Sequence, residues 1–417
     1  MKIVADENIP LLRDAFGPLG EVVAVPADAI RPALVRDAQA LLVRSVTPVG
    51  PALLDGSSVR LVATATIGTD HVDREYLARR GIGFASAQSS NARSVAEYVF
   101  AALAVLAERG GWRFEEKMLG IVGVGHIGSR VARIAEGIGM TVLRNDPPLA
   151  RSARGEKTPG VFSAQHPSGP SGKRHLESFR PPAVPHTGDA KFVPIKALAD
   201  ADIVTFHVPL AREGPDATYH MINESLIGRL KRGVILLNTS RGSVAATSAL
   251  KAALAAGRVG ALALDVWENE PNISLELLDA ADLATPHIAG YSYDGKVNGT
   301  RMILEALCRH FSLARDWDPS PLMPPPHSPR VRLPAGVDRQ QAIRYATRAA
   351  YDAEADDAHL RAMGAKPADE RAAYFGSLRR DYPLRREFPE TTVELPRADA
   401  RVRSALEALG FPVRAAS

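Results

Sequence analysis

Short apolar runs separated by polar and helix-like segments dominate the N-terminal part of the chain. The runs are rich in valine, leucine and alanine, which favours buried strands. Because helix-like segments lie between them, we expect a small α/β domain here. The expected strands are KIVAD from Lys2, EVVAV from Glu21, ALLVRS from Ala40 and RLVATAT from Arg60.

A long apolar segment from Ser94 to Gly110 changes the pattern. It begins with a residue type that caps helices, continues through small and apolar residues and ends at a glycine, which predicts one long buried helix. From Leu119 a second series of apolar runs alternates with helical segments, and this predicts a parallel sheet with buried strands. The expected strands are LGIVG, TVLRND, ADIVTFHV, GVILLNTS, GALALDV and DLATP.

Two proline-rich stretches divide the rest of the chain. Residues 147–190 show little periodic hydrophobicity and predict a disordered surface insertion. Residues 319–330 predict a linker, after which helical periodicity returns. The expected domains are residues 1–93 together with 291–318, residues 94–290 with the insertion, and residues 331–417.

The C-terminal segment, residues 331–417, offers few apolar helix positions for a core of its own. Burial against a second copy of the chain would supply the missing apolar contact. We therefore expect it to pair two chains through a face that includes Ile343, Ala346, Ala349 and Ala350.

Composition narrows the class of protein. The chain has 417 residues, of which 46% are hydrophobic and 24% charged, so it can bury several cores. The net charge of +4 is not gathered into a basic stripe with interleaved aromatics, so we expect no nucleic-acid partner. Asp6 and Glu7 interrupt the apolar start, and Cys308 is the single cysteine, which together predict a cytosolic protein without disulfides or a membrane anchor.

The strongest motif is GIVGVGHIGSR, which places Gly123, Gly125 and Gly128 between an expected strand and an expected helix. Glycines at this spacing permit a tight turn, a close backbone approach to a pyrophosphate and close helix packing. Asp146, at the end of the next strand, would accept hydrogen bonds from the adenosine ribose and favour NAD over NADP. Arg144 lies close enough in sequence to leave NADP binding open.

Further chemistry follows three later strands: Arg241 in LLNTSRGS, Glu270 in LALDVWENEP and His287 in LATPHIAGYS. The carboxyl ends of parallel strands meet at one edge of the sheet, so these residues can converge on one site. Hydride removal from a secondary alcohol needs a base for the hydroxyl proton, a cation for an adjacent carboxylate, and a group that keeps the base basic. Histidine, arginine and glutamate meet those needs in that order.

With these residues the sequence resembles the D-2-hydroxyacid dehydrogenase family, whose catalytic set is an arginine after a strand, a glutamate before proline and a histidine in a PHI segment. The segments ADENIP, LVRSVTPV, NARSVAEYVF, DVWENEP and TPHIAGYSYDGK resemble a branch that acts on a phosphorylated hydroxy acid. This resemblance implies a Rossmann-like doubly wound parallel sheet, a smaller α/β substrate (lid) domain and a C-terminal α+β dimerisation domain.

The resemblance also implies the roles of individual residues. His287 would be the acid/base, Glu270 would orient it, and Arg241 would hold the substrate carboxylate. Ser45, Thr66 and Tyr291 would contact substrate, and Arg44 is a candidate for the phosphate. The expected NAD contacts are Gly123, Gly125, His126, Ile127, Gly128, Asp146, Val208, Thr239, Ser240, Arg241, Asp265 and Gly290.

Two functional alternatives remain open at this point, whereas a metal site is not expected. TDHVD, with Asp70, His71 and Asp73, has the residue types of a metal site, but hydride transfer requires no metal and we expect none. The substrate could be that of another D-2-hydroxyacid dehydrogenase, such as phosphoglycerate. The chain could also be an NAD-sensing binding protein, because a fold does not determine a function.

Overall fold

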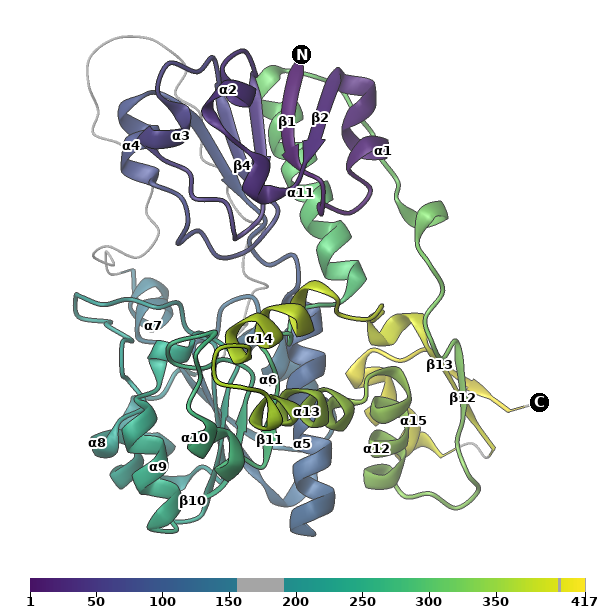
Figure 1. Ribbon diagram of the computed structural model, residues 1–417. Coiled ribbons are helices and arrows are strands. Elements are labelled where there is room, and N and C mark those ends of the chain that lie inside the picture. The colour runs from purple at the N-terminus through teal and green to yellow at the C-terminus, as the bar shows by residue number, and fades with distance from the viewer. Residues whose placement is uncertain (156–190, 397–398, 417) are drawn as a thin grey trace. The chain divides into compact units, whose positions relative to one another are not determined.

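The computed structural model describes residues 1–155, 191–396 and 399–416. These residues form two compact units. We call residues 1–91 with 292–324 the N-terminal unit, and residues 92–155, 191–291 and 325–416 the larger unit. Figure 1 shows the helices and strands of each.

The N-terminal unit is built on a parallel sheet with the order β2-β1-β3-β4-β5. Alternation along β1 sends Ile3 and Ala5 to a core shared with α1 and α11, and Val4 to a core shared with α2, α3 and α4. The strands are β1 (Lys2–Asp6), β2 (Glu21–Val25), β3 (Ala40–Val43), β4 (Leu61–Thr64) and β5 (Gly83–Ser86). The helices are α1 (Leu12–Phe16), α2 (Pro32–Val35), α3 (Pro51–Leu54), α4 (Arg74–Arg79) and α11 (Tyr293–Phe311).

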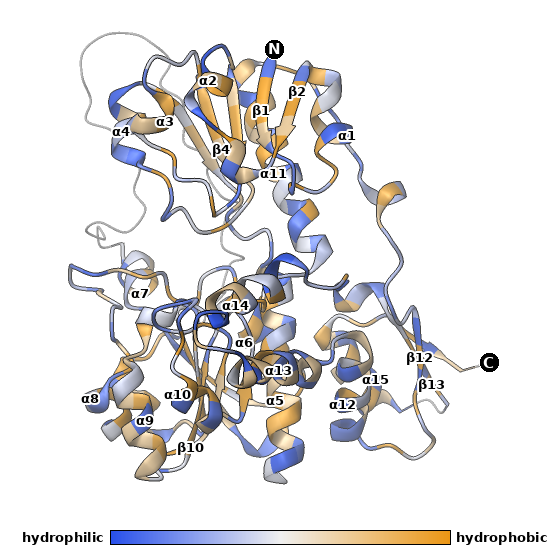
Figure 2. Ribbon diagram, in the orientation of Figure 1, coloured by the Kyte–Doolittle hydropathy of each residue, from blue (hydrophilic) through white to orange (hydrophobic). Residues whose placement is uncertain are grey.

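The larger unit contains a parallel sheet with the order β11-β10-β9-β8-β6-β7. A hydrophobic core covers each face of it, so β6, β8, β9 and β10 are mainly apolar, as Figure 2 shows, whereas the edge strand β7 is more polar. The strands are β6 (Met118–Val122), β7 (Thr141–Asn145), β8 (Ile203–Phe206), β9 (Val234–Asn238), β10 (Val259–Leu264) and β11 (Leu283–Ala284). The helices are α5 (Ala92–Gly110), α6 (Gly128–Gly137), α7 (Pro147–Ala153), α8 (Glu224–Arg229), α9 (Thr247–Ala255) and α10 (Leu275–Ala280).

Strand β6 has β7 on one side and β8 on the other, so the strand order reverses there. The carboxyl end of such a switch point is where doubly wound sheets bind ligands. The predicted Rossmann-like parallel sheet is confirmed, and the glycine motif follows β6 directly.

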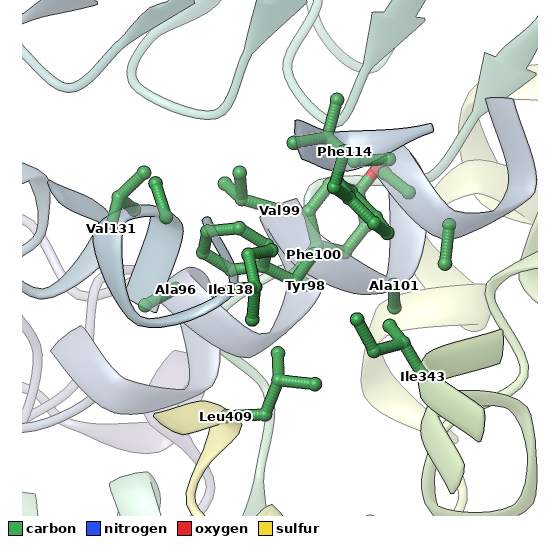
Figure 3. Close-up of a cluster of buried hydrophobic side chains, with 14 of the residues drawn as sticks. Ala96, Tyr98, Val99, Phe100, Ala101, Phe114, Val131, Ile138, Ile343 and Leu409 are labelled. Atoms are coloured by element: carbon green, nitrogen blue, oxygen red, sulfur yellow. The ribbon is translucent and has the colours of Figure 1, made fainter. Parts of the chain in front are cut away.

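The predicted long helix is α5, in which every residue from Val95 to Ala107 is buried. Figure 3 shows Tyr98, Phe100 and Ala101 of this helix packed with Ile343 and Leu409 of the C-terminal segment. The C-terminal segment is therefore part of the core of the larger unit.

The C-terminal segment adds a small parallel sheet with the order β12-β13-β14 and four α-helices. These elements are β12 (Arg330–Arg332), β13 (Thr392–Leu395), β14 (Val413–Ala415), α12 (Arg339–Ala350), α13 (Ala353–Arg361), α14 (Arg371–Arg380) and α15 (Ala400–Leu409). Ile343 and Ala346 have no exposed surface and belong to the same core as α5. Our expectation that this face awaits a second chain was wrong for Ile343 and Ala346, because α5 of the same chain covers them, whereas Ala349 and Ala350 are partly exposed.

The predicted insertion, residues 147–190, begins with an ordered helix rather than with disorder. Asp146 caps α7 through its side chain, and Pro147 occupies the first turn, where a missing N–H costs nothing. The prediction was therefore wrong for residues 147–155. Residues 156–190 lie outside the described part of the chain.

Candidate active site

The fingerprint glycines occupy the loop after β6 and the start of α6. Gly123 has a φ of +87°, and a Cβ there would lie 2.6 Å from the carbonyl oxygen of His207 and 2.9 Å from Cγ1 of Val208. A Cβ at Gly128 would overlap the carbonyl oxygen of Gly123. A Cβ at Gly125 would meet no atom of a described residue within 4 Å, so a pyrophosphate has room to approach the backbone there.

Asp146 joins this loop to the next strand. One carboxylate oxygen accepts the N–H of Val124 at 2.8 Å, and the other accepts the N–H of Leu149 at 2.9 Å. Each oxygen keeps a lone pair for a ribose hydroxyl. Burial raises the pKa of Asp146, although both backbone hydrogen bonds oppose that shift. The guanidinium Nη2 of Arg144 lies 2.6 Å from Oε1 of Glu136, and this ion pair competes with binding of a 2′-phosphate by Arg144.

The segment after β9 is held in place by Asn238. Its Oδ1 accepts the N–H of Ser240 at 3.1 Å and the Ser240 hydroxyl at 2.7 Å, while its Nδ2 donates to the carbonyl of Arg241 at 3.1 Å. The Thr239 hydroxyl lies 3.1 Å from Nδ1 of His207, whose pKa burial lowers to about 3, so that ring stays neutral. Asn238 was not among our predicted site residues.

We call residues 285–291 the catalytic turn. Asp265, which directly follows β10, holds this turn through hydrogen bonds. The Asp265 carboxylate accepts the N–H groups of Ile288 at 2.7 Å and Ala289 at 3.0 Å, and its carbonyl accepts the N–H of His287 at 2.7 Å. His287 has a φ of +58°, a conformation that non-glycine residues keep only where their surroundings impose it. Asp265 imposes it, although we had expected an NAD contact at this position.

Thr285 links the catalytic turn to two neighbouring elements. Its hydroxyl donates to Asp265 at 2.7 Å and lies 2.7 Å from the hydroxyl of Tyr98 in α5. Its carbonyl accepts the indole N–H of Trp267 at 2.9 Å. All these side chains are buried, so the start of the turn is rigidly anchored.

The structure pairs His287 with Glu270, as the sequence predicts for an acid/base. Nδ1 of His287 lies 2.8 Å from Oε2 of Glu270, and the N–H of Trp267 donates to Oε1 at 2.7 Å. A carboxylate partner assigns the hydrogen to Nδ1, so Nε2 is the nitrogen that can exchange a proton with a substrate. Burial alone would raise the pKa of Glu270, but its hydrogen bonds and neighbouring positive charge lower it overall.

Four further predicted residues lie around this site in the larger unit. Ile127 occupies the N-cap position of α6, and burial lowers the pKa of the neighbouring His126. Gly290 belongs to the catalytic turn and is partly exposed. Tyr291 ends the turn, and its ring packs edge-on against Tyr382 with 5.7 Å between the ring centroids.

Ser45, Thr66 and Arg44 belong to the N-terminal unit. Arg44 and Ser45 directly follow β3, and Ser45 is exposed. The Thr66 hydroxyl lies 2.8 Å from that of Thr64 and donates to the carbonyl of Gly68 at 3.2 Å. Next to Arg44, Lys296 is partly buried, and burial with the Arg44 charge lowers its pKa to about 8.

Asp70, His71 and Asp73 do not form a metal site in the structure. Asp73 caps α4 by accepting the N–H of Tyr76 at 2.8 Å. Among the described residues there is no group of three His, Cys, Asp or Glu side chains that could hold a metal ion. Over the same residues, no helix combines the length and apolar character needed to cross a membrane.

Comparisons with known proteins agree with this geometry. The family model "D-isomer specific 2-hydroxyacid dehydrogenase, NAD binding domain" matches residues 91–164 and 181–289, and a model described as a domain of unknown function matches residues 322–410. The D-lactate dehydrogenase structure from Aquifex aeolicus, complexed with NAD and lactic acid, shares the fold with a TM-score of 0.54 and 24% identity, covering 75% of this chain and 96% of that one.

Two curated relatives match along almost the whole chain. The erythronate-4-phosphate dehydrogenase of Salinibacter ruber is 46% identical over 94% of both chains. The one from Marinobacter nauticus is 41% identical over 99% of this chain and all of its own. The predicted family and its phosphorylated-substrate branch are both confirmed: the chain belongs to the erythronate-4-phosphate dehydrogenases, which are NAD-dependent 2-hydroxyacid dehydrogenases.

Proposed function

We propose that the protein oxidises 4-phospho-D-erythronate to 3-hydroxy-2-oxo-4-phosphooxybutanoate with NAD, a step in the formation of pyridoxal 5′-phosphate. The observation that carries this proposal is the His287–Glu270 pair, 2.8 Å apart, at the carboxyl edge of the NAD-binding sheet. The names of the relatives support the identity of the substrate.

The larger unit can supply most of the chemistry. Nε2 of His287 accepts the proton of the C2 hydroxyl while the C2–H bond breaks and the C2 carbonyl forms. The resulting imidazolium lies against the Glu270 carboxylate, which stabilises the charge. Arg241, after β9, binds the carboxylate next to C2 through its planar guanidinium. NAD, when bound, takes the hydride from C2.

The described residues fit this cofactor. The backbone at Gly125 is open to a pyrophosphate, and α6, which begins at Gly128, directs the positive end of its dipole toward this loop. Asp146 would accept the adenosine ribose hydroxyls and repel a 2′-phosphate. Ser45, Thr66, Arg44 and Tyr291 would complete the substrate contacts.

Substrate-dependent formation of NADH tests the proposal. We expect turnover with 4-phospho-D-erythronate and a kcat/KM at least tenfold lower with 3-phospho-D-glycerate. Preference for phosphoglycerate would identify another D-2-hydroxyacid dehydrogenase. Binding of NAD without turnover of either compound would favour an NAD-sensing binding protein. Such a protein would not need the catalytic set of Arg241, Glu270 and His287.

We also propose a cytosolic homodimer that pairs through the C-terminal segment. Because α5 covers Ile343 and Ala346, the pairing surface must lie elsewhere, and Tyr345 on the same helix is 51% exposed. Removing the segment would uncover α5, so the test uses the full chain. Light scattering should show a dimer at micromolar concentration that Tyr345→Glu weakens; a monomeric wild type would contradict the proposal.

A further inference from the structure

Helix α14 of the C-terminal segment brings Arg379 to the end of the catalytic turn. Phe375, one helical turn earlier, is buried in the core of the larger unit and anchors the inward face of the helix. Arg379 follows on that face, and its guanidinium lies over the ring of Tyr291, with Cζ 5.6 Å from the ring centroid. Tyr291 directly follows the His287–Gly290 segment.

Arg379 also lies within electrostatic range of the acid/base pair. Its positive charge is among the influences that lower the pKa of Glu270, behind the hydrogen bond and charge of His287 and the N–H of Trp267. Arg379 therefore adds a positive charge in the neighbourhood of Glu270. It comes from a part of the chain that the 2-hydroxyacid dehydrogenase family model does not cover.

The guanidinium of Arg379 lacks an anionic partner among the described residues. Its Nε is buried without a hydrogen-bond partner there, a state that costs free energy. Arg385 also has a buried Nε without such a partner, but its two terminal nitrogens donate to the carbonyls of Ala289 and Ser94, and Arg386 pairs with Glu390 at 2.9 Å. An unpaired planar guanidinium beside an aromatic ring suits a phosphate or carboxylate ligand.

The proposed substrate carries two anionic groups, one at each end of a short carbon chain. Arg241 accounts for the carboxylate, and the phosphate needs a cation of its own. We propose that Arg379, supported by Tyr291, binds the substrate phosphate, so that the C-terminal segment determines specificity for phosphorylated substrates. This inference rests on the proposed function and names a residue that selects its substrate.

Substrate pairs test the role of Arg379. In Arg379→Met we expect kcat/KM for 4-phospho-D-erythronate to fall roughly 100-fold, because a charge-assisted contact is lost. Activity with D-erythronate, which lacks the phosphate, should change less than about threefold, within the range of neutral surface changes. Arg379→Lys keeps the positive charge but loses the planar guanidinium, so its kcat/KM for 4-phospho-D-erythronate should lie between those of the wild type and Arg379→Met.

Arg380→Met is the matched control. The Arg380 side chain is 70% exposed and lies 3.4 Å from Asp381, so its loss should leave both substrates and NADH binding unchanged. NADH fluorescence titration and melting temperature should be equal in the two methionine variants. If Arg379→Met does not fold, the two substrates are compared in Arg379→Lys instead.

Inorganic phosphate separates this inference from the proposed function. Its inhibition constant, measured against the phosphorylated substrate or by direct titration, should rise at least tenfold in Arg379→Met. An unchanged constant would overturn the inference whatever the substrate. Equal losses on both substrates, with a shifted pH profile, would also overturn it and make Arg379 a positioning residue for Glu270. If the wild type did not prefer the phosphorylated acid, the proposed function would fail while the phosphate titration still decided the role of Arg379.

Discussion

The catalytic turn of the larger unit and the strand ends of the N-terminal unit carry functional residues in contrasting ways. In the turn, Asp265 and Glu270 hold His287 through backbone and side-chain hydrogen bonds that are mostly buried. After β3, Ser45 is exposed and Arg44 is half-buried. The His287–Glu270 pair, which would transfer the proton, is preorganised, whereas Ser45, which is expected to meet only the substrate, is open to solvent.

The largest effect should come from removing the acid/base. We expect His287→Ala to lower kcat by about 10²- to 10⁴-fold, because no other group replaces the proton acceptor. The fold and NAD binding should persist, since the imidazole ring is hydrogen-bonded to Glu270 and its proposed role concerns the substrate. Stopped-flow measurement of NADH formation gives the change in kcat, and NADH titration shows whether cofactor binding persists. Near-normal turnover would refute the acid/base assignment.

Asp265→Asn should be the next most damaging change. The amide presents a donor where the carboxylate accepts an N–H, so one buried hydrogen bond of the catalytic turn is lost. We expect the free energy of unfolding to fall by about 2 kcal/mol and kcat to fall with it. Urea unfolding measures the first quantity. Asp279→Asn, on the exposed end of α10, is the control and should change neither.

The architecture could be predicted because its signals are local. Continuous apolar runs identified β6, β8, β9 and β10, and the glycine spacing identified the cofactor loop. The Asp146–Pro147 pair also carried a local signal, a capping residue followed by a proline, that should have indicated α7. The surrounding proline-rich composition obscured it.

The remaining site residues depend on contacts between distant parts of the chain. Arg379 reaches Tyr291 only because Phe375 anchors α14 in the core, and no short motif encodes that approach. Asn238 resembles any polar residue at a strand end until its three hydrogen bonds are seen. Tertiary packing, which periodicity does not report, decides both cases.

Glu270→Gln should change the pH dependence as well as the rate. The carboxylate, whose pKa is lowered, stays negative across the working range and favours protonated His287. Oxidation needs the neutral ring, so without that charge the acidic limb of kcat/KM should move to lower pH while the maximum falls. Glu268→Gln is the control, since Glu268 contacts His220 instead. A limb that does not move would contradict the pairing.

Asp146→Ala should mainly change the cofactor. We expect the Kd of NAD to rise about tenfold and discrimination against NADP to relax, because the ribose acceptor and the negative charge disappear together. The variant also loses the N-cap of α7, worth about 1 kcal/mol. Titration of the variant and the wild type with NAD and with NADP measures both Kd values. An unchanged preference would assign specificity to another group.

Ser45→Ala should have the smallest effect and is the sharpest test of the contrast between the two regions. Because Ser45 is exposed and precedes the exposed Val46, its hydroxyl should contribute nothing measurable to stability. A single neutral hydrogen bond to the substrate is worth about 1 kcal/mol, so KM should rise roughly fivefold with kcat nearly constant. Steady-state kinetics and a melting curve test both parts. A lower melting temperature would show that this strand end, like the catalytic turn, is held by its own side chains, and the contrast would not hold.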